Sequence, residues 1–409
     1  MDEIIVSYIR QTKETLLART DIQAAFHSVR DAMRRRVDEI SELSAKDQPV
    51  VPELAWKDIK DGAVADRTLD NIRRCGCVVI RGVYPAQQAR EWNDEMGHYL
   101  GQNNYSAKAA AKGNMDNYFG DLASAKPQIF GIYWSRPQVM ARQAEAMAMT
   151  KRFLNRLWSV EGPMGDEFDP DNDLAYADRT RRRAPGDKTL GLSPHMDSGS
   201  YERWVDPAYQ KIYEHIFSGN WQKYDPWRAA FRTQTREFKS PAVCSMFRTF
   251  QGWTALTPQG PGDGTLQLLP IANSIAYTLL RSLLPDIPQE QFAIARPGRA
   301  LGINEKWHPD LMPGMVSIPA VEPGDTVWWH PDVIHAVENE HTGDDYASVI
   351  YIGATPVCSK NQTYAKLQAE HFLNGFSAPD FAAENYETDF EGRATIDDLT
   401  ELGRAQMCL

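Results

Sequence analysis

Cysteine is scarce in this chain of 409 residues, and its few copies are irregularly spaced. There are five cysteines, an odd number, and the spacing does not suggest the paired framework of a small secreted protein. Free thiols are usual in reducing compartments, so the sequence favours a cytoplasmic protein. The cysteines are Cys75, Cys77, Cys244, Cys358 and Cys408.

Basic residues and long apolar runs are also lacking. Lysine and arginine total 44 against 55 aspartate and glutamate residues, which gives a formal net charge of -11. Nucleic acids and anionic membranes attract clustered positive charge, so neither is the expected partner. No apolar run approaches the roughly 20 residues that span a bilayer, and the first residues lack the pattern of a signal peptide. A small-molecule partner remains, and the oligomeric state stays open.

The first half of the chain is predicted to be mainly helical. Apolar residues recur at helical spacing up to residue 45, which predicts a helical arm over residues 1–50. Residues 67–84 should form a helix and then a strand, and Cys75 and Cys77 should be buried thiols there. Strong helix formers predict further helices over 86–100 and 136–158.

The sequence pattern changes from helical periodicity to short β-rich runs near residue 170. Short β-rich runs separated by Gly, Pro and Asp predict a β core over residues 170–358. A helical insert is expected at 203–236, and residues 359–409 return to helix and loop. The sequence therefore predicts one α+β domain spanning residues 1–409.

The strongest chemical signal is the triplet His195-Met196-Asp197, at the end of a β-rich run. Residues two apart on a strand point the same way, so His195 and Asp197 can face one site. A third ligand from a distant strand would complete the facial arrangement of two histidines and one carboxylate that binds iron(II). The segment 324–335 offers His335 and His330. We favour His335 because it follows a short loop and precedes the expected strand 348–352, whereas His330 ends the preceding strand.

The β region resembles the phytanoyl-CoA dioxygenase-like branch of the iron(II)/2-oxoglutarate dioxygenases. The matching motifs occur in the same order in this sequence: Pro185-Gly186 before His195-Met196-Asp197, then Trp253 to Leu256, Gly262 to Pro270, Gly324-Asp325 and His335.

A second resemblance, to the YbiU-like family of that superfamily, covers nearly the whole chain. It includes residues 74–82, 132–138, 153–158, 179–186, 247–256, 328–335 and 385–392.

These resemblances imply a fold and an activity. The fold would be a double-stranded β-helix, also called a jelly roll and similar to the cupins, wrapped by N- and C-terminal helices. His195, Asp197 and His335 would hold Fe(II), with 2-oxoglutarate and dioxygen as co-substrates. The enzyme would oxidise a small metabolite, most simply by hydroxylation, and convert 2-oxoglutarate to succinate.

One feature of the resembled enzymes is missing. Their distal histidine is usually followed, about eleven residues later, by an arginine that binds the far carboxylate of 2-oxoglutarate; here that position is Tyr346. We expect Arg248 to replace it, with Arg183 as the second candidate, because a guanidinium fits a carboxylate with two hydrogen bonds. Trp253 aligns with a tryptophan that lines the co-substrate pocket. Arg248 and Trp253 have opposite strand parity, so both would face inward only with a bulge, which Gly252 could supply.

Two alternatives follow from the same residues. The missing arginine favours an iron oxygenase or oxidase that does not use 2-oxoglutarate. The other alternative is a metal-binding protein without catalytic activity, which would bind a partner through its N-terminal helix. If the protein is an enzyme acting on a metabolite, the arginines favour an anionic one.

Overall fold

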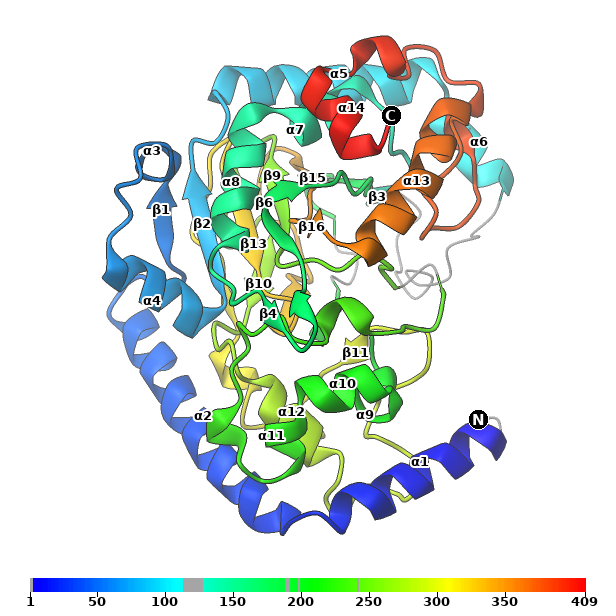
Figure 1. Ribbon diagram of the computed structural model, residues 1–409. Helices are drawn as coiled ribbons and strands as arrows, with labels where there is room; N and C mark the ends of the chain where they lie inside the picture. The colour runs from blue at the N-terminus through cyan, green and yellow to red at the C-terminus, as the bar shows by residue number, and fades with distance from the viewer. Residues whose placement is uncertain (1–2, 113–127, 188–191, 198, 241–242) are drawn as a thin grey trace.

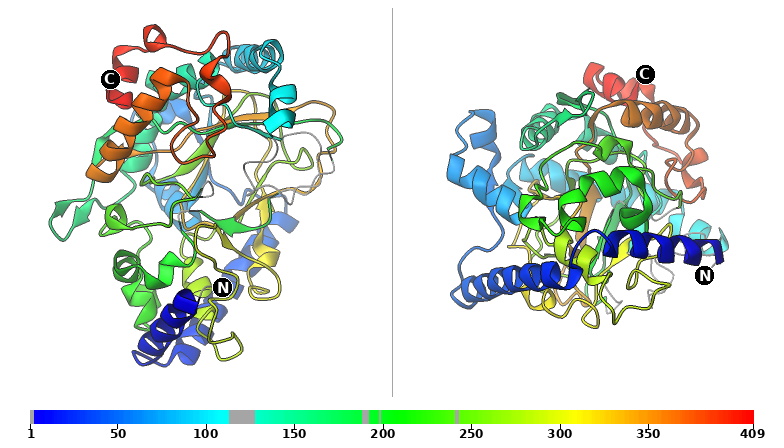
Figure 2. Two further views of the ribbon diagram at one scale, coloured as in Figure 1. Left: turned by 90° about the vertical axis from the view of Figure 1, so that its right-hand side faces the viewer. Right: turned by 60° about the horizontal axis from the view of Figure 1, so that its bottom comes forward.

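The computed structural model describes residues 3–112, 128–187, 192–197, 199–240 and 243–409. It is a mixed α+β structure with several sheets, and two of these sheets hold most of the strands (Figure 1). Helices from the beginning of the chain cover one end of the molecule, and helices from its end cover the opposite end (Figure 1, Figure 2).

The larger sheet has seven strands and contains both early and late segments of the chain. Its pairs are antiparallel except for β1 with β2. In spatial order its strands are β1 (Glu53–Ala55), β2 (Cys77–Arg81), β13 (Thr326–Trp329), β9 (Gln251–Ala255), β15 (Ala347–Tyr351), β7 (Thr180–Arg183) and β3 (Ile129–Phe130). The sheet thus extends beyond the predicted β core, because three of its strands come from before residue 170.

The smaller sheet has five short antiparallel strands. In spatial order they are β11 (Leu301–Gly302), β8 (His195–Met196), β14 (His335–Val337), β10 (Leu266–Leu268) and β12 (Val316–Ser317). Apolar side chains of β2, β9, β10, β13 and β15 pack together between the two sheets, including Val79, Trp253 and Leu268. This packing draws the short strands of the smaller sheet against the longer ones.

The predicted N-terminal arm consists of two helices, α1 (Glu3–Leu17) and α2 (Ile22–Ala45). The break was not predicted, although Asp21 is a good helix-starting residue and its side chain accepts a hydrogen bond from the Ala24 N–H. Helix α2 packs on α12 (Ile275–Arg281), where Phe26 meets Tyr277 with ring centroids 4.9 Å apart. The arm is therefore fastened to the body rather than free.

The helix-then-strand prediction for residues 67–84 is confirmed by α4 (Asp66–Cys75) and β2. Gly76 joins them in the left-handed conformation, with φ of 72°, which glycine adopts without strain. Both thiols are buried, and all five cysteines are free.

The remaining early helices are α3 (Trp56–Lys60), α5 (Ala86–Gln102), α6 (Tyr105–Lys112), α7 (Arg136–Gln143) and α8 (Glu145–Asn155). The predicted single helix over 136–158 is thus divided, because Ala144 has an extended backbone.

The helical insert begins with α9 (Glu202–Val205), α10 (Pro207–Ile212) and α11 (Glu214–Phe217). Short 3-10 turns follow at Trp221–Lys223 and Arg232–Gln234. The C-terminal part contains α13 (Ser359–Asn374) and α14 (Glu401–Met407). Within the described part of the chain, no helix is both long and apolar enough to cross a bilayer.

Candidate metal centre

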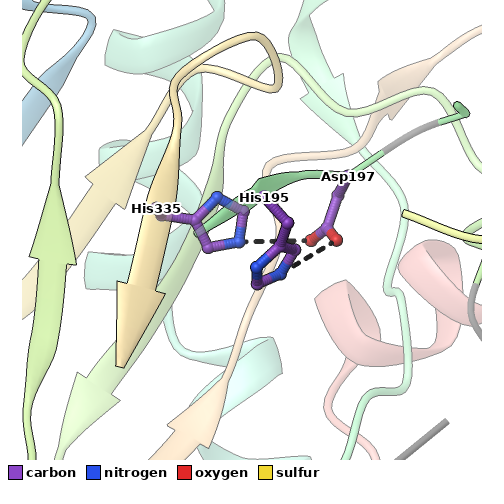
Figure 3. A group of neighbouring side chains, drawn as sticks. All are labelled: His195, Asp197 and His335. Atoms are coloured by element: carbon purple, nitrogen blue, oxygen red, sulfur yellow. Dashed lines mark ion pairs between the residues drawn. The ribbon is translucent and has the colours of Figure 1, made fainter. Parts of the chain in front are cut away.

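Strands β8 and β14 bring two histidines face to face. His195 and His335 are direct cross-strand partners, and such partners have side chains on the same face of a sheet. Their ring centroids lie 4.2 Å apart. Asp197 follows β8 directly and, being two residues after His195, turns its carboxylate toward the same point (Figure 3).

The three side chains form one compact cluster. The Asp197 Oδ1 atom lies 3.6 Å from His195 Nε2, and Asp197 Oδ2 lies 3.6 Å from His335 Nε2. One ligand atom from each residue lies within 4.8 Å of the others. Two donors bound at about 2.1 Å to one ion lie roughly 3 to 4 Å apart, so the cluster has the right size for a single transition-metal ion.

Backbone carbonyls set the orientation of both imidazole rings. The Nδ1 atom of His195 lies 2.7 Å from the Ser193 carbonyl oxygen, and that of His335 lies 3.2 Å from the Val333 carbonyl oxygen. A carbonyl only accepts, so each Nδ1 carries the proton and each Nε2 keeps its lone pair toward Asp197. This is the tautomer that a metal ion needs, held by the hydrogen bonds that commonly orient metal-binding histidines.

Burial and charge keep His335 and Asp197 in the protonation states that bind a metal ion. Desolvation and the neighbouring His195 lower the pKa of His335 to about 3, so its ring is neutral. Burial alone would raise the pKa of Asp197, but the nearby histidines, once protonated at low pH, and the Arg248 and Arg179 guanidiniums outweigh it and lower the pKa. One carboxylate and two neutral imidazoles fit iron(II).

The cluster faces a cavity of about 110 Å³ between the sheets. Trp253 and Trp329 line it, and the Trp329 ring centroid is 5.1 Å from that of His335. Trp328, in contrast, is fully buried on the other side of β13. The adjacent tryptophans thus face opposite ways, as strand alternation predicts, and Trp329 covers the cluster of His195, Asp197 and His335.

Arg248 also lines this cavity, as expected, although its backbone differs from the prediction. It lies in the segment before β9 rather than on the strand, so no bulge is needed for it to share the cavity with Trp253. Gly252 pairs regularly with Trp328 across the sheet. A Cβ at Gly252 would lie 2.4 Å from the Trp328 ring, so this glycine serves close packing.

Arg183 does not line the cavity. Backbone carbonyls of Gly264, Asp187, Glu338 and Asn339 accept hydrogen bonds from its buried guanidinium. Its position favours a structural role in tying loops together rather than the predicted contact with a co-substrate.

Arg181 and Gln251 are among the cavity residues that were missed as site candidates. Arg181 stands two residues from Arg183 on β7 and lines the cavity, as does Gln251, two residues from Trp253 on β9. Strand alternation from Trp253 would have indicated Gln251. The alternation within residues 179–183 could not show which arginine meets the cavity, because that depends on which loops approach β7.

His330, the alternative third ligand, lies away from the cluster. Its ring stacks on Trp158 with centroids 4.7 Å apart, its Nε2 donates to the Pro226 carbonyl, and its Nδ1 accepts from the Asp332 N–H. Both ring nitrogens are therefore engaged, and burial lowers the pKa of His330 to about 3. The geometry brings His335, not His330, beside Asp197.

A buried charged group centred on Asp332, called the hub below, adjoins the cluster. Asp332 accepts hydrogen bonds from Arg203 and Arg232 at 2.6 and 3.0 Å, and from the Tyr213 and Tyr224 hydroxyls. Arg203 also donates to the backbone carbonyls of Asp197 and Gly199, at 2.7 and 2.9 Å. The hub thus connects the helical insert to the segments that carry Asp197 and His335.

Known proteins resemble this chain over nearly its full length. The YbiU protein of Escherichia coli strain K12 is 45% identical over 399 residues, covering 97% of this chain and 94% of YbiU. A crystal structure from Salmonella typhimurium LT2, provisionally described as an oxidoreductase, superimposes with a TM-score of 0.95 at 44% identity, covering 99% of this chain and 97% of that one.

A more distant relative has the same architecture. The crystal structure of the GlcNAc Inducible Gene 2 protein from Candida albicans superimposes with a TM-score of 0.81 at 28% identity, covering 100% of this chain and 89% of that one. The Gig2-like family model matches residues 3–409. The predicted relationship to YbiU is confirmed, and this chain belongs to the Gig2-like family.

Proposed function

We propose that this protein is an iron(II)- and 2-oxoglutarate-dependent dioxygenase that oxidises a small molecule. The observation that carries the proposal is the cluster of His195, Asp197 and His335 at a cavity between two sheets. We assign the two sheets to a double-stranded β-helix of the phytanoyl-CoA dioxygenase-like branch, formed by one domain. Because all five cysteines are free, we infer that the protein works in the cytoplasm.

The cluster supplies three ligands on one side of an ion and leaves the opposite side open. Iron(II) bound there would activate dioxygen, so that substrate and 2-oxoglutarate are converted to hydroxylated substrate, succinate and carbon dioxide. The remaining work belongs to the protein. The Ser193 and Val333 carbonyls hold the two imidazoles, and Trp253 and Trp329 exclude water from the reacting centre.

Arg248 supports 2-oxoglutarate as co-substrate despite the missing arginine after His335. Its side chain is buried, with 8% of the residue exposed. Among the described residues, its Nε has no hydrogen-bond partner and no carboxylate forms an ion pair with it. A buried guanidinium without an anion is costly, and the far carboxylate of 2-oxoglutarate would satisfy it with charge-assisted hydrogen bonds. This observation favours 2-oxoglutarate over an iron enzyme that does without it.

The test is spectroscopic. Iron(II) and then 2-oxoglutarate are added to the apo-protein without oxygen, and the weak visible charge-transfer band of the chelated keto acid is measured. We expect a saturable band in the wild type, no band in His335→Ala, and a need for roughly tenfold or more 2-oxoglutarate in Arg248→Ala.

His330→Ala is a control for the loss of a buried histidine outside the cluster, and it should keep the band if it remains folded. The thermal unfolding of each apo-variant is measured beside the titrations, so that loss of the fold is recognised. Iron binding without any band in the wild type would refute the role of 2-oxoglutarate. It would favour instead an oxygenase or oxidase whose substrate itself chelates the metal.

A further inference from the structure

The cavity beside the metal cluster has an excess of positive charge. Among the described residues that line it, the arginines are Arg179, Arg181 and Arg248, whereas the carboxylates are Asp178 and Asp197. Asp178 lies 3.6 Å from Arg179 and neutralises it. Asp197 belongs to the cluster. Within the described part of the cavity wall, Arg181 and Arg248 therefore remain without a carboxylate of their own.

Arg181 is deeply buried and incompletely hydrogen-bonded. Only 3% of the residue is exposed, and its Nε has no partner among the described residues. Its one hydrogen bond within this part of the structure joins Nη2 to the Gly264 carbonyl at 3.2 Å. An isolated buried charge is costly unless a ligand pairs with it.

Arg183 provides an internal comparison. It lies on the same strand and is also buried, but its terminal nitrogens donate to four backbone carbonyls of the described residues, and it stays outside the cavity. A structural arginine in this sheet thus looks different from Arg181. The comparison indicates that a ligand bound in the cavity would supply the hydrogen-bond acceptor that Arg181 lacks.

Charge balance indicates the class of that partner. The charges can be summed with Arg248 assigned to 2-oxoglutarate. Iron(II) and the two arginines are positive, whereas Asp197 and the 2-oxoglutarate dianion are negative. One positive charge remains unbalanced. A monoanion would neutralise the filled cavity. A phosphate monoester, at nearly two negative charges near pH 7, would overshoot.

We propose that the substrate is a compact monocarboxylate and that Arg181 receives its carboxylate. This inference rests on the proposed function. The substrate would share this one cavity with 2-oxoglutarate, because Arg181, Arg248 and the cluster all line it, and this limits the size of the part that enters. Gln251 lines the same cavity, and neither polar atom of its buried side-chain amide has a partner among the described residues. Its amide offers the substrate one further neutral donor and acceptor.

The test compares butanoate with butanamide, which has nearly the same shape without the charge. Each is titrated calorimetrically, without oxygen, into protein saturated with iron(II) and 2-oxoglutarate, while the charge-transfer band is monitored. We expect butanoate to bind roughly tenfold or more tightly than butanamide, since hydrogen bonds to charged groups contribute about 1.5–3 kcal/mol. Methyl phosphate should bind more weakly than butanoate.

Arg181→Gln should abolish the preference for butanoate and leave the band intact, whereas Arg181→Lys should retain part of the preference. Arg182→Gln is the matched control, because Arg182 lies on the same strand but donates to the Asn93 carbonyl outside the cavity. It should change neither titration.

Four outcomes would overturn the inference. The first is that butanoate and butanamide bind equally well or that neither binds, and the second is that Arg181→Gln still prefers butanoate to butanamide. The third is that butanoate displaces 2-oxoglutarate, and the fourth is that methyl phosphate binds more tightly than butanoate. Absence of the band in the wild type would instead count against the proposed function itself.

Discussion

Replacing Asp332 with asparagine should weaken both the fold and the metal centre. The Asp332 carboxylate is 1% exposed and lies within 3.0 Å of the Arg203 and Arg232 guanidiniums. Burial alone would raise its pKa, but the two guanidiniums hold that pKa far below its usual value, so the carboxylate is charged. Asparagine would leave both arginines buried without a counter-charge. Breaking a buried pair in this way costs about 3–5 kcal/mol of unfolding free energy.

The effect should reach the metal through Arg203. While its Nη1 binds Asp332, its Nη2 and Nε hold the carbonyl oxygens of Asp197 and Gly199. Releasing Arg203 would free the segment that carries Asp197. Loss of an outer partner of a metal ligand typically lowers metal affinity roughly 10- to 100-fold, and we expect a loss of that size here.

The assay has two parts. Urea unfolding of the apo-protein gives the change in stability, and titration of iron(II) against a competing chelator, under conditions where the variant is folded, gives the affinity. The matched control is Asp173→Asn. Asp173 pairs with Lys151 at 2.6 Å, both side chains are buried, and neither residue lines the cavity. It should lose comparable stability and keep its iron affinity. Unchanged iron affinity in Asp332→Asn, or an equal loss in both variants, would refute the reasoning.

Three further predictions concern stability, each measured by urea unfolding. Gly252→Ala should cost about 1–3 kcal/mol, because its Cβ would meet the Trp328 ring; an unchanged midpoint would contradict this. Asp21→Ala should cost about 1 kcal/mol by removing the hydrogen bond to the Ala24 N–H at the start of α2; no loss would mean that packing alone holds the helix start. Burial lowers the pKa of His308 to about 4. Because the unfolded state then binds its proton first as the pH falls below about 6.5, the wild type should lose about 2 kcal/mol between pH 7 and pH 5 through this residue. His308→Gln should lack that part of the pH dependence, and an unaltered dependence would show that His308 is charged or exposed.

Local patterns predicted the parts of the site that depend on neighbouring residues. Strand alternation placed His195 and Asp197 on one face, since side chains two residues apart point the same way whatever surrounds the strand. The same rule separated Trp328 from Trp329. Gly76 between α4 and β2 is likewise a local requirement, set by a left-handed backbone at the helix end.

Local sequence patterns gave wrong or ambiguous predictions where the outcome depends on packing against distant segments. Arg181 and Arg183 look equivalent in the sequence, and only the approach of the loops carrying Gly264 and Asn339 makes Arg183 structural. Arg248 was assigned to a strand by its apolar neighbours, yet strand β9 begins only three residues later, at Gln251. Loop approach and strand ends depend on the packing of the whole sheet, which no short window of sequence contains.

By itself, then, the sequence determined the α+β composition, the free buried thiols, and two candidate ligands held together by a two-residue spacing. The tertiary structure decided the third, because the choice between His335 and His330 depends on β14 pairing with β8 while Trp158 and Pro226 enclose His330. It also decided that Arg181 and Arg248 share a cavity with the cluster. The physical reason is that alternation and capping act over a few residues, whereas strand pairing joins segments 140 residues apart, as from His195 to His335.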